Sequence, residues 1–137
     1  MDVNELRLVV TTDDYDAAVA FYRDRLGLVE AAEYLSESDG RVVILEAGKA
    51  TLEIADARHA EHVDQVEVGR RVAGHVRVAF GVSDATATTA DLTAAGARLI
   101  AEPTRTPWNS LNARLEAPAG LQLTLFEDLG DLPDPGD

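Results

Sequence analysis

The chain has 137 residues, of which 46% are hydrophobic, and its formal net charge at pH 7 is -13. This length and apolar content suffice for one domain-sized core, which excludes extensive disorder. The acid excess would repel a nucleic-acid backbone, and the lack of cysteine excludes disulfides, thiolate metal sites and cysteine nucleophiles.

The first half of the chain predicts a strand, a helix and three further strands. Alternation of apolar residues over Leu6–Thr11 is typical of a strand with one face on a core. Asp13 or Asp14 can cap a helix that stops at Gly27. Three strands are then expected at Glu30–Leu35, Arg41–Glu46 and Ala50–Ala55. The turn signal SESDG separates the first two strands, and AGK separates the last two.

The second half repeats this order after a polar linker, residues 58–75, which could hold a short helix. A strand is expected over Val76–Val82, and a helix from Ser83 or Asp84 to Gly96. Three strands follow, with APAG turning the last hairpin, at Arg98–Ala101, Leu111–Glu116 and Leu121–Glu127.

Repetition of one order of elements indicates an internal duplication. We therefore predict an α+β fold of two tandem βαβββ modules, residues 1–57 and 76–127. The modules and their linker are expected to form one domain over residues 1–127. The acidic, proline-containing residues 128–137 are expected to be a frayed tail.

This organisation resembles the vicinal oxygen chelate superfamily, which contains glyoxalase I, extradiol dioxygenases, fosfomycin-resistance enzymes and bleomycin-resistance proteins. The resemblance rests on DDYDAAVAFYRDRLGL in the first module, and on VAFGVSD and AGARLIAEPTRTPWNSLNARLEAPAGLQLTLFE in the second. It covers the chain from about Leu6 to Glu127. It implies curved sheets around a cleft and, commonly, a homodimer.

Metal-using members of this superfamily place one ligand, usually a histidine or an acid, on each of four strands. By the resemblance, these positions hold Arg7, Glu53, Arg77 and Thr124 here. An arginine stays protonated and repels a dication, so no cofactor is predicted. A shifted alignment would leave a fallback divalent metal site with His75 and Glu53 as ligands.

Strand parity gives an independent indication of which side chains face the cleft, because successive side chains alternate between faces. One face is expected to form the core under the helices and consists of Leu6, Leu8, Leu52, Ile54, Val76, Val78, Phe80, Val82, Leu121, Leu123 and Leu125. The opposite, concave face carries Arg7, Val9, Thr11, Glu53, Arg77, Ala79, Gly81, Thr124 and Phe126. Both arginines and Glu53 should therefore point into one cavity.

Arg7 and Arg77 have two possible roles there. They could be structural charges paired with Glu53 or Glu116, because a buried guanidinium without a partner is strongly unfavourable. They could instead clamp a carboxylate or enolate, because the planar fork donates two parallel hydrogen bonds. Two nearby arginines would keep Glu53 ionised, which favours a salt-bridge partner over a general base.

Other side chains are candidates for the cleft wall. Trp108, the only tryptophan, lies in the loop PTRTPWNSLN and could cap the sheet or stack on an aromatic or cationic ligand. Tyr34, Asn112 and Arg114 are further candidates.

Two patterns favour structural roles instead. Phe21 and Tyr22, at helical spacing, are expected in the core. His59 and His62 could lie on one helical turn, but structural zinc would need two more ligands.

We expect the protein to bind a small organic molecule without a metal, with antibiotic sequestration as one form of this function. Bleomycin-resistance proteins, by resemblance, hold a cationic drug in an acidic, aromatic-lined groove, whereas two cleft arginines argue against a purely cationic ligand. The alternative is a lyase, isomerase or dioxygenase-like enzyme, with a metal or with the arginines stabilising an enolate-like oxyanion. A third possibility is a subunit whose cleft is packed shut.

The N-terminus has no basic stretch followed by a long apolar run, and no apolar segment approaches membrane-spanning length. We therefore expect a cytoplasmic protein whose partners are a small molecule and a second copy of itself. Neither nucleic acid nor a membrane is expected as a partner.

Overall fold

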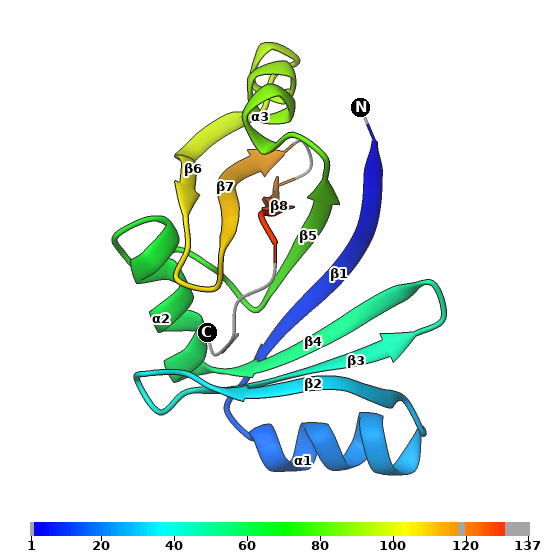
Figure 1. The fold of residues 1–137 in the computed structure, drawn as a ribbon. Helices are drawn as coiled ribbons and strands as arrows, with labels where there is room; N and C mark the ends of the chain where they lie inside the picture. The colour runs from blue at the N-terminus through cyan, green and yellow to red at the C-terminus, as the bar shows by residue number, and fades with distance from the viewer. Residues whose placement is uncertain (1, 118–119, 131–137) are drawn as a thin grey trace.

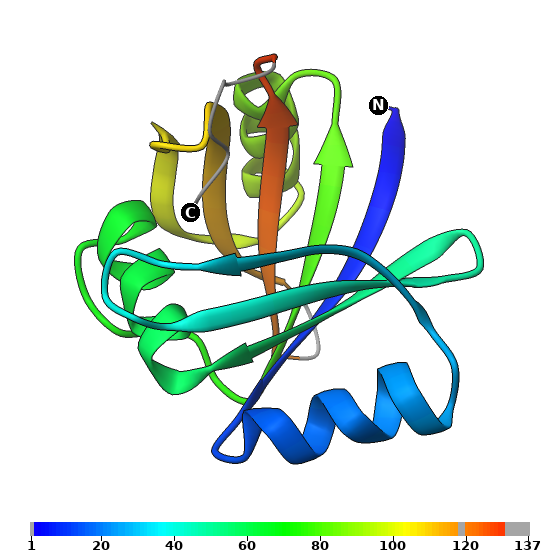
Figure 2. The ribbon, with the colours of Figure 1, turned by 60° about the horizontal axis from the view of Figure 1, so that its bottom comes forward.

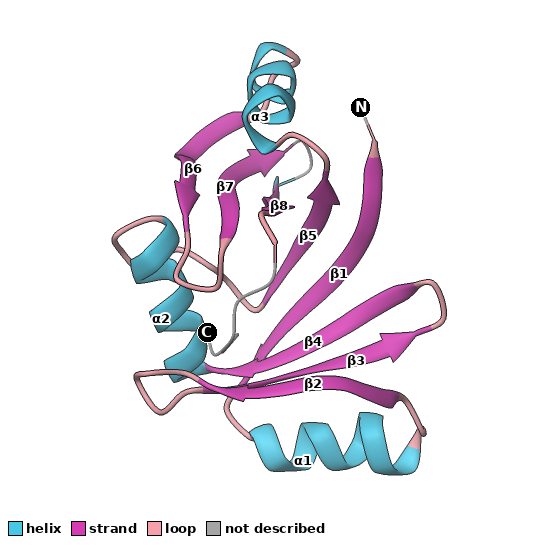
Figure 3. Ribbon diagram, in the orientation of Figure 1, coloured by secondary structure: helices cyan, strands magenta, loops and turns pink. Residues whose placement is uncertain are grey.

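A computed structural model describes residues 2–117 and 120–130 of the chain, without the side chains of Phe21 and Arg25. Eight strands form one curved, unclosed sheet in the order β2-β3-β4-β1-β5-β8-β7-β6, with the helices packed on it (Figures 1 and 3). The strands are β1 (Val3–Thr12), β2 (Val29–Leu35), β3 (Arg41–Ala47), β4 (Ala50–Asp56), β5 (Val76–Val82), β6 (Arg98–Arg105), β7 (Ser110–Ala117) and β8 (Leu121–Asp128). The helical segments are α1 (Tyr15–Val19), η1 (Ala20–Arg25), α2 (Ala57–Glu67) and α3 (Ala85–Ala94).

The pairing of the strands follows the duplication. In each half the first strand is parallel to the last, β1 to β4 and β5 to β8, and the two first strands pair antiparallel at the centre of the sheet. The predicted α+β fold of two βαβββ modules is therefore confirmed. Figure 2 shows β1 of the first half running beside β5 and β8 of the second half.

The first helix differs from the single regular helix that the spacing predicts. Asp14 caps it as expected, since its carboxylate accepts a hydrogen bond from the backbone N–H of Ala17 at 3.1 Å. From Ala20 onward the helix widens into the π-helical segment η1. This segment ends at Arg25, and Gly27 follows it with a φ of 87°, which lets the chain turn so that the N–H of Leu28 donates to the carbonyl of Tyr22.

The linker holds a full helix, α2, which begins directly after β4. The carboxylate of Asp56 caps it by accepting a hydrogen bond from the backbone N–H of His59 at 2.9 Å. Gly40 makes room for this start, because a Cβ at that position would lie 2.1 Å from the backbone nitrogen of His59.

Two apolar cores lie between the helices and the sheet. In the first, α1 packs on β3 and β4 with the buried residues Tyr15, Val19, Val43, Leu45 and Ile54. In the second, β5 and the start of α3 pack on β7 and β8 with the buried residues Val82, Ala85, Ala113, Leu115 and Leu125. Tyr22, predicted in the core, packs against the first of these cores, whereas the side chain of Phe21 lies outside the described residues.

Part of the predicted helix-side core is wrong. Leu6, Leu8 and Val76 are 37–39% exposed, as is Leu121 at 39%. The reason is the placement of the helices: α1 lies against the strands of the first half and α3 against β6–β8 and the end of β5 at Val82, so that no helix of the described residues covers Leu6, Leu8 and Val76 (Figure 1).

Of the regions that bear on the sequence predictions, the APAG turn and the acidic tail lie partly outside the described residues. No helix in the described part of the chain has the length and apolar character needed to cross a membrane.

Candidate functional site

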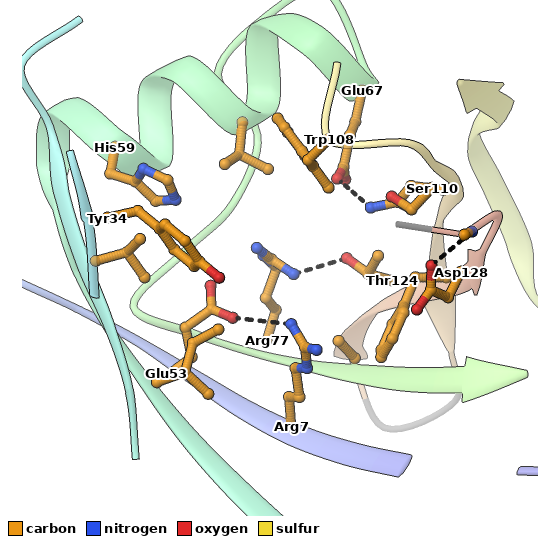
Figure 4. A pocket seen from close by; sticks show the side chains of 17 residues that line it. Arg7, Tyr34, Glu53, His59, Glu67, Arg77, Trp108, Ser110, Thr124 and Asp128 are labelled. Atoms are coloured by element: carbon orange, nitrogen blue, oxygen red, sulfur yellow. Dashed lines mark hydrogen bonds and ion pairs between the residues drawn. The ribbon is translucent and has the colours of Figure 1, made fainter. Parts of the chain in front are cut away.

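The concave side of the sheet encloses a cavity of about 380 Å³. Its walls come from both halves of the chain and from one face of α2 (Figure 4). Residues predicted for the cleft that line it are Arg7, Tyr34, Glu53, Arg77, Trp108, Asn112 and Thr124. Phe126, predicted on the concave face, also lines it, and other polar lining residues are His59, Glu67, Ser110 and Asp128. Arg114, predicted for the cleft wall, does not line the cavity, and neither do Val9, Thr11 and Gly81, which were predicted on the concave face.

Strand register explains why these side chains converge. Val9 on β1 lies opposite Glu53 on β4 and opposite Arg77 on β5, so the acid and the arginine flank one apolar residue in a single row. In the next row, Ala79 on β5 lies between Arg7 on one side and Thr124 on the other. Because residues in register share a face, all four side chains point to the concave side.

Arg7 is neutralised by the protein itself. Its Nε donates to the Glu5 carboxylate at 2.7 Å, and its Nη1 lies 3.7 Å from the Glu53 carboxylate. Its guanidinium carbon also stacks 4.6 Å from the ring centre of Phe126. Burial alone would lower the pKa of Arg7, but the Glu5 hydrogen bond and the charges of Glu53 and Glu5 raise it above its usual value.

Arg77 differs sharply from Arg7. It is only 9% exposed, and its Nη1 donates to the hydroxyl of Thr124 at 2.7 Å. Among the described residues no carboxylate forms an ion pair with it and no other acceptor binds its guanidinium. Burial lowers the pKa of Arg77 and repulsion from Arg114 adds to this, and the attraction of Glu67, Glu53 and Asp64 offsets only part of the shift.

The four positions where the superfamily would place metal ligands do not suit a divalent cation. They hold two guanidinium groups, which carry only donors and a fixed positive charge, one hydroxyl and one carboxylate. The hydroxyl of Thr124 already accepts from Arg77, and Glu53 faces Arg7. In the described part of the chain, no three histidine or acidic side chains are grouped closely enough to hold a metal ion.

The fallback pair of metal ligands is not brought together. His75 does not line the cavity that Glu53 lines; it lies in a separate shallow depression beside Thr11, Arg71 and Gly74. Its Nδ1 lies 2.8 Å from the carbonyl oxygen of Thr11.

Arg114 lies behind the cavity wall, completely buried, where it joins β7 to α2. Its guanidinium donates to the carboxylates of Asp64 at 2.8 Å and Glu67 at 2.7 Å, and to the side chain of Gln122 at 2.8 Å. The Asp64 carboxylate also accepts the backbone N–H groups of Val72 and Ala73. These contacts make Arg114 a structural residue of the α2–β7 junction.

The pKa of Asp64 reflects this environment. Burial by itself would raise the pKa, but hydrogen bonds from the backbone of Ala73 and Val72 and from Arg114 outweigh burial and hold the pKa below its usual range.

A chain of hydrogen bonds runs from this junction along the cavity wall. The amide of Asn112 donates to the second carboxylate oxygen of Glu67 at 2.6 Å, and the hydroxyl of Ser110 donates to the Asn112 oxygen at 2.6 Å. Both oxygens of Glu67 are therefore occupied, one by Arg114 and one by Asn112. This carboxylate is held in the wall and does not reach Arg77.

Helix α2 supplies cavity residues that the sequence interpretation missed. His59, Val63 and Glu67 are four residues apart, which places them on one helical face. That spacing was the available signal. His59 is 3% exposed and lies beside Tyr34 at one end of the cavity (Figure 4). The ring centre of His62 lies 6.4 Å from that of His59 and 6.4 Å from that of Trp108.

The family model described as Glyoxalase/Bleomycin resistance protein/Dioxygenase superfamily matches residues 6–125. No curated protein is similar enough in sequence to match.

Solved structures agree over nearly the whole chain. Methylmalonyl-CoA epimerase from Mycobacterium tuberculosis is 22% identical with a TM-score of 0.67, covering 93% of this chain and 90% of that chain. A variant of the Streptomyces coelicolor epimerase in complex with 2-nitronate-propionyl-CoA is 22% identical with a TM-score of 0.68, covering 94% and 100%. A mutant of 4-hydroxymandelate synthase from Streptomyces coelicolor is 21% identical with a TM-score of 0.63, covering 98% of this chain and 42% of that one. At these identities the likeness shows the fold.

Proposed function

Because the chain belongs to the glyoxalase/bleomycin resistance protein/dioxygenase superfamily, we propose that it uses the superfamily cavity to bind a small organic molecule without a divalent metal. One observation carries the proposal: Arg7 and Arg77 stand in the cavity at two of the four metal-ligand positions. The positive charge of Arg77, with which no carboxylate of the described residues forms an ion pair, then does what a cation does in metal-using relatives, which is to attract electron-rich oxygen atoms.

The size and lining of the cavity support binding of a small molecule. Its volume of about 380 Å³ falls in the range of roughly 300–1,000 Å³ that small-molecule pockets occupy. The wall includes the aromatic side chains Tyr34, Trp108 and Phe126 and a few placed polar groups. Such a cavity is not packed shut.

Antibiotic sequestration is one form of this function, and its strongest support is the superfamily itself. The aromatic wall and the acidic molecule suit a drug-binding protein, whereas the buried charge of Arg77 disfavours a purely cationic drug. We place the protein in the cytoplasm, without nucleic-acid or membrane partners.

We also propose a homodimer. Leu6, Leu8 and Val76 form an exposed apolar strip on the outer face of β1 and the start of β5, where no helix in the described part of the chain covers the sheet. A second copy packed on this strip would remove it from water. Leu8→Asp should then change the molecular mass measured by light scattering from that of a dimer to that of a monomer.

The function is tested with metal-stripped protein. Trp108, the only tryptophan, lines the cavity, so its fluorescence reports occupancy directly. We expect antibiotics or small carboxylates to change this fluorescence and to raise the melting temperature, with no requirement for Mg²⁺, Mn²⁺, Fe²⁺ or Zn²⁺. A stoichiometric metal in the purified protein, together with binding that chelation abolishes, would refute the proposal.

The second candidate function is an enzyme of the lyase, isomerase or dioxygenase type. Its support is that an epimerase and a synthase are among the similar structures, and that Glu53 and His59 could exchange protons beside two guanidinium groups. Arg7 and Arg77 would then stabilise an enolate-like oxyanion. Turnover of α-keto or hemithioacetal substrates by the metal-stripped protein would favour this candidate over the binder.

A further inference from the structure

Arg77 is the most unusual group in the cavity. A guanidinium has five N–H donors, and the described residues satisfy one of them, through the neutral hydroxyl of Thr124. A buried charge without an ion-pair partner costs stability, so its retention calls for a partner that the folded chain does not itself supply. Figure 4 shows the Arg77 guanidinium reaching into the middle of the cavity, between Glu53 and Thr124.

The acids of the cavity are occupied elsewhere. Glu53 faces Arg7, both oxygens of Glu67 are taken by Arg114 and Asn112, and Asp128 accepts the backbone N–H of Gly130 at 3.0 Å. Rearranging any of them to reach Arg77 would break one of these contacts. The remaining donors of Arg77 are therefore open to a ligand.

We propose that the cavity binds a monocarboxylic acid with an apolar or aromatic body, whose carboxylate forms a charge-assisted pair with Arg77. This inference rests on the proposed function and names its ligand class. The fork of the guanidinium matches the two oxygens of a carboxylate.

The rest of the wall fits the body of such an acid. Trp108, Phe126, Ile44 and Val63 supply apolar surface around the charged centre. The neighbouring carboxylates of Glu53 and Glu67 disfavour a ligand with several negative charges, because each added charge would face them in a buried site. One carboxylate satisfies Arg77 without this repulsion.

The test compares matched probes by fluorescence of Trp108. Benzoate and phenylacetate carry the charge, benzamide and phenylacetamide are neutral isosteres, and benzylamine is cationic. For the wild-type protein we expect each carboxylate to bind at least about tenfold more tightly than its amide, with benzylamine weakest.

Variants assign the preference to one side chain. Arg77→Met should abolish the preference for carboxylates over amides while the apolar wall remains. Arg98→Met is the matched control, because Arg98 is an exposed arginine paired with Glu116 far from the cavity lining, and it should leave the preference unchanged. If Arg77→Met does not fold, Arg77→Lys, which keeps a charge but loses the fork, should reduce the preference at least about threefold.

The outcomes separate this inference from the proposed function. Equal binding of amides and carboxylates, weakened by Trp108→Ala, would overturn the carboxylate inference and leave a small-molecule binder. A carboxylate preference that survives in Arg77→Met would also overturn the inference. Failure of all five probes and of the wider antibiotic screen to bind would overturn both.

Discussion

Arg114→Met should severely destabilise the protein. The substitution removes the one cation that bonds to both Asp64 and Glu67, and the side chains of all three are at most 2% exposed. Removing one partner of a buried ion pair costs about 3–5 kcal/mol, because the remaining charge stays buried. The entropy of unfolding is about 2.1 cal/mol/K per residue, or roughly 0.29 kcal/mol/K for 137 residues. A loss of about 4 kcal/mol therefore corresponds to a fall in melting temperature of about 14 °C.

The assay is thermal unfolding followed by circular dichroism at pH 7. Arg98→Met is again the control, because Arg98 and its partner Glu116 are both exposed. An exposed ion pair contributes at most about 1 kcal/mol, so the melting temperature of this variant should fall by no more than about 3 °C. Adding Glu67→Gln to Arg114→Met should restore part of the lost melting temperature, because Glu67 is then no longer a buried charge without a cation. Asp64 keeps its ion pair with Arg71 at 3.0 Å in both variants. If the melting temperature of Arg114→Met falls no further than that of the control, our account of the α2–β7 junction is refuted.

Three other predictions concern single side chains. Asp64 has a lowered pKa in the folded protein, so its charge stabilises the fold above the unfolded pKa of about 3.9, and this contribution is lost as the pH falls through the folded pKa. The difference in melting temperature between wild type and Asp64→Asn should therefore be constant from about pH 7 to 5 and narrow below about pH 4. A difference that stays constant at all pH values would contradict this. Gly40→Ala would place a Cβ 2.1 Å from the backbone at the start of α2 and should cost about 1–3 kcal/mol in chemical denaturation, whereas Gly74→Ala, with no atom within 4 Å, should cost far less. Thr124→Val removes the hydroxyl that accepts from Arg77 and should weaken benzoate binding about threefold to tenfold without affecting benzamide, which fluorescence titration would measure.

Strand parity predicted the floor of the cavity because it depends on a period of two and little else. Arg7, Glu53 and Arg77 occupy one face as soon as their strands pair, whatever packs around them. The same rule puts Asn112 and Arg114 on a common face of β7, but it does not predict that only Asn112 lines the cavity.

What separates these two residues is helix α2. It covers Arg114 completely and leaves Asn112 at the cavity. The linker is polar, and the partner that buries Asp64 and Glu67 comes from a strand about fifty residues later in the chain. No local pattern contains that contact. The exposed strip at Leu6 and Leu8 was missed for a related reason, because parity tells which side a residue faces and not whether a helix lies there.

Helix α2 is attached to both halves of the molecule. Its first residue follows directly on β4 of the first half, and its last turn is bonded through Arg114 to β7 of the second. Neither half can open while the helix keeps both attachments, so the duplicated modules should behave as one foldon. Hydrogen exchange should then release the amides of β4 and β7 at the same free energy, although the two strands lie in separate copies of the repeat.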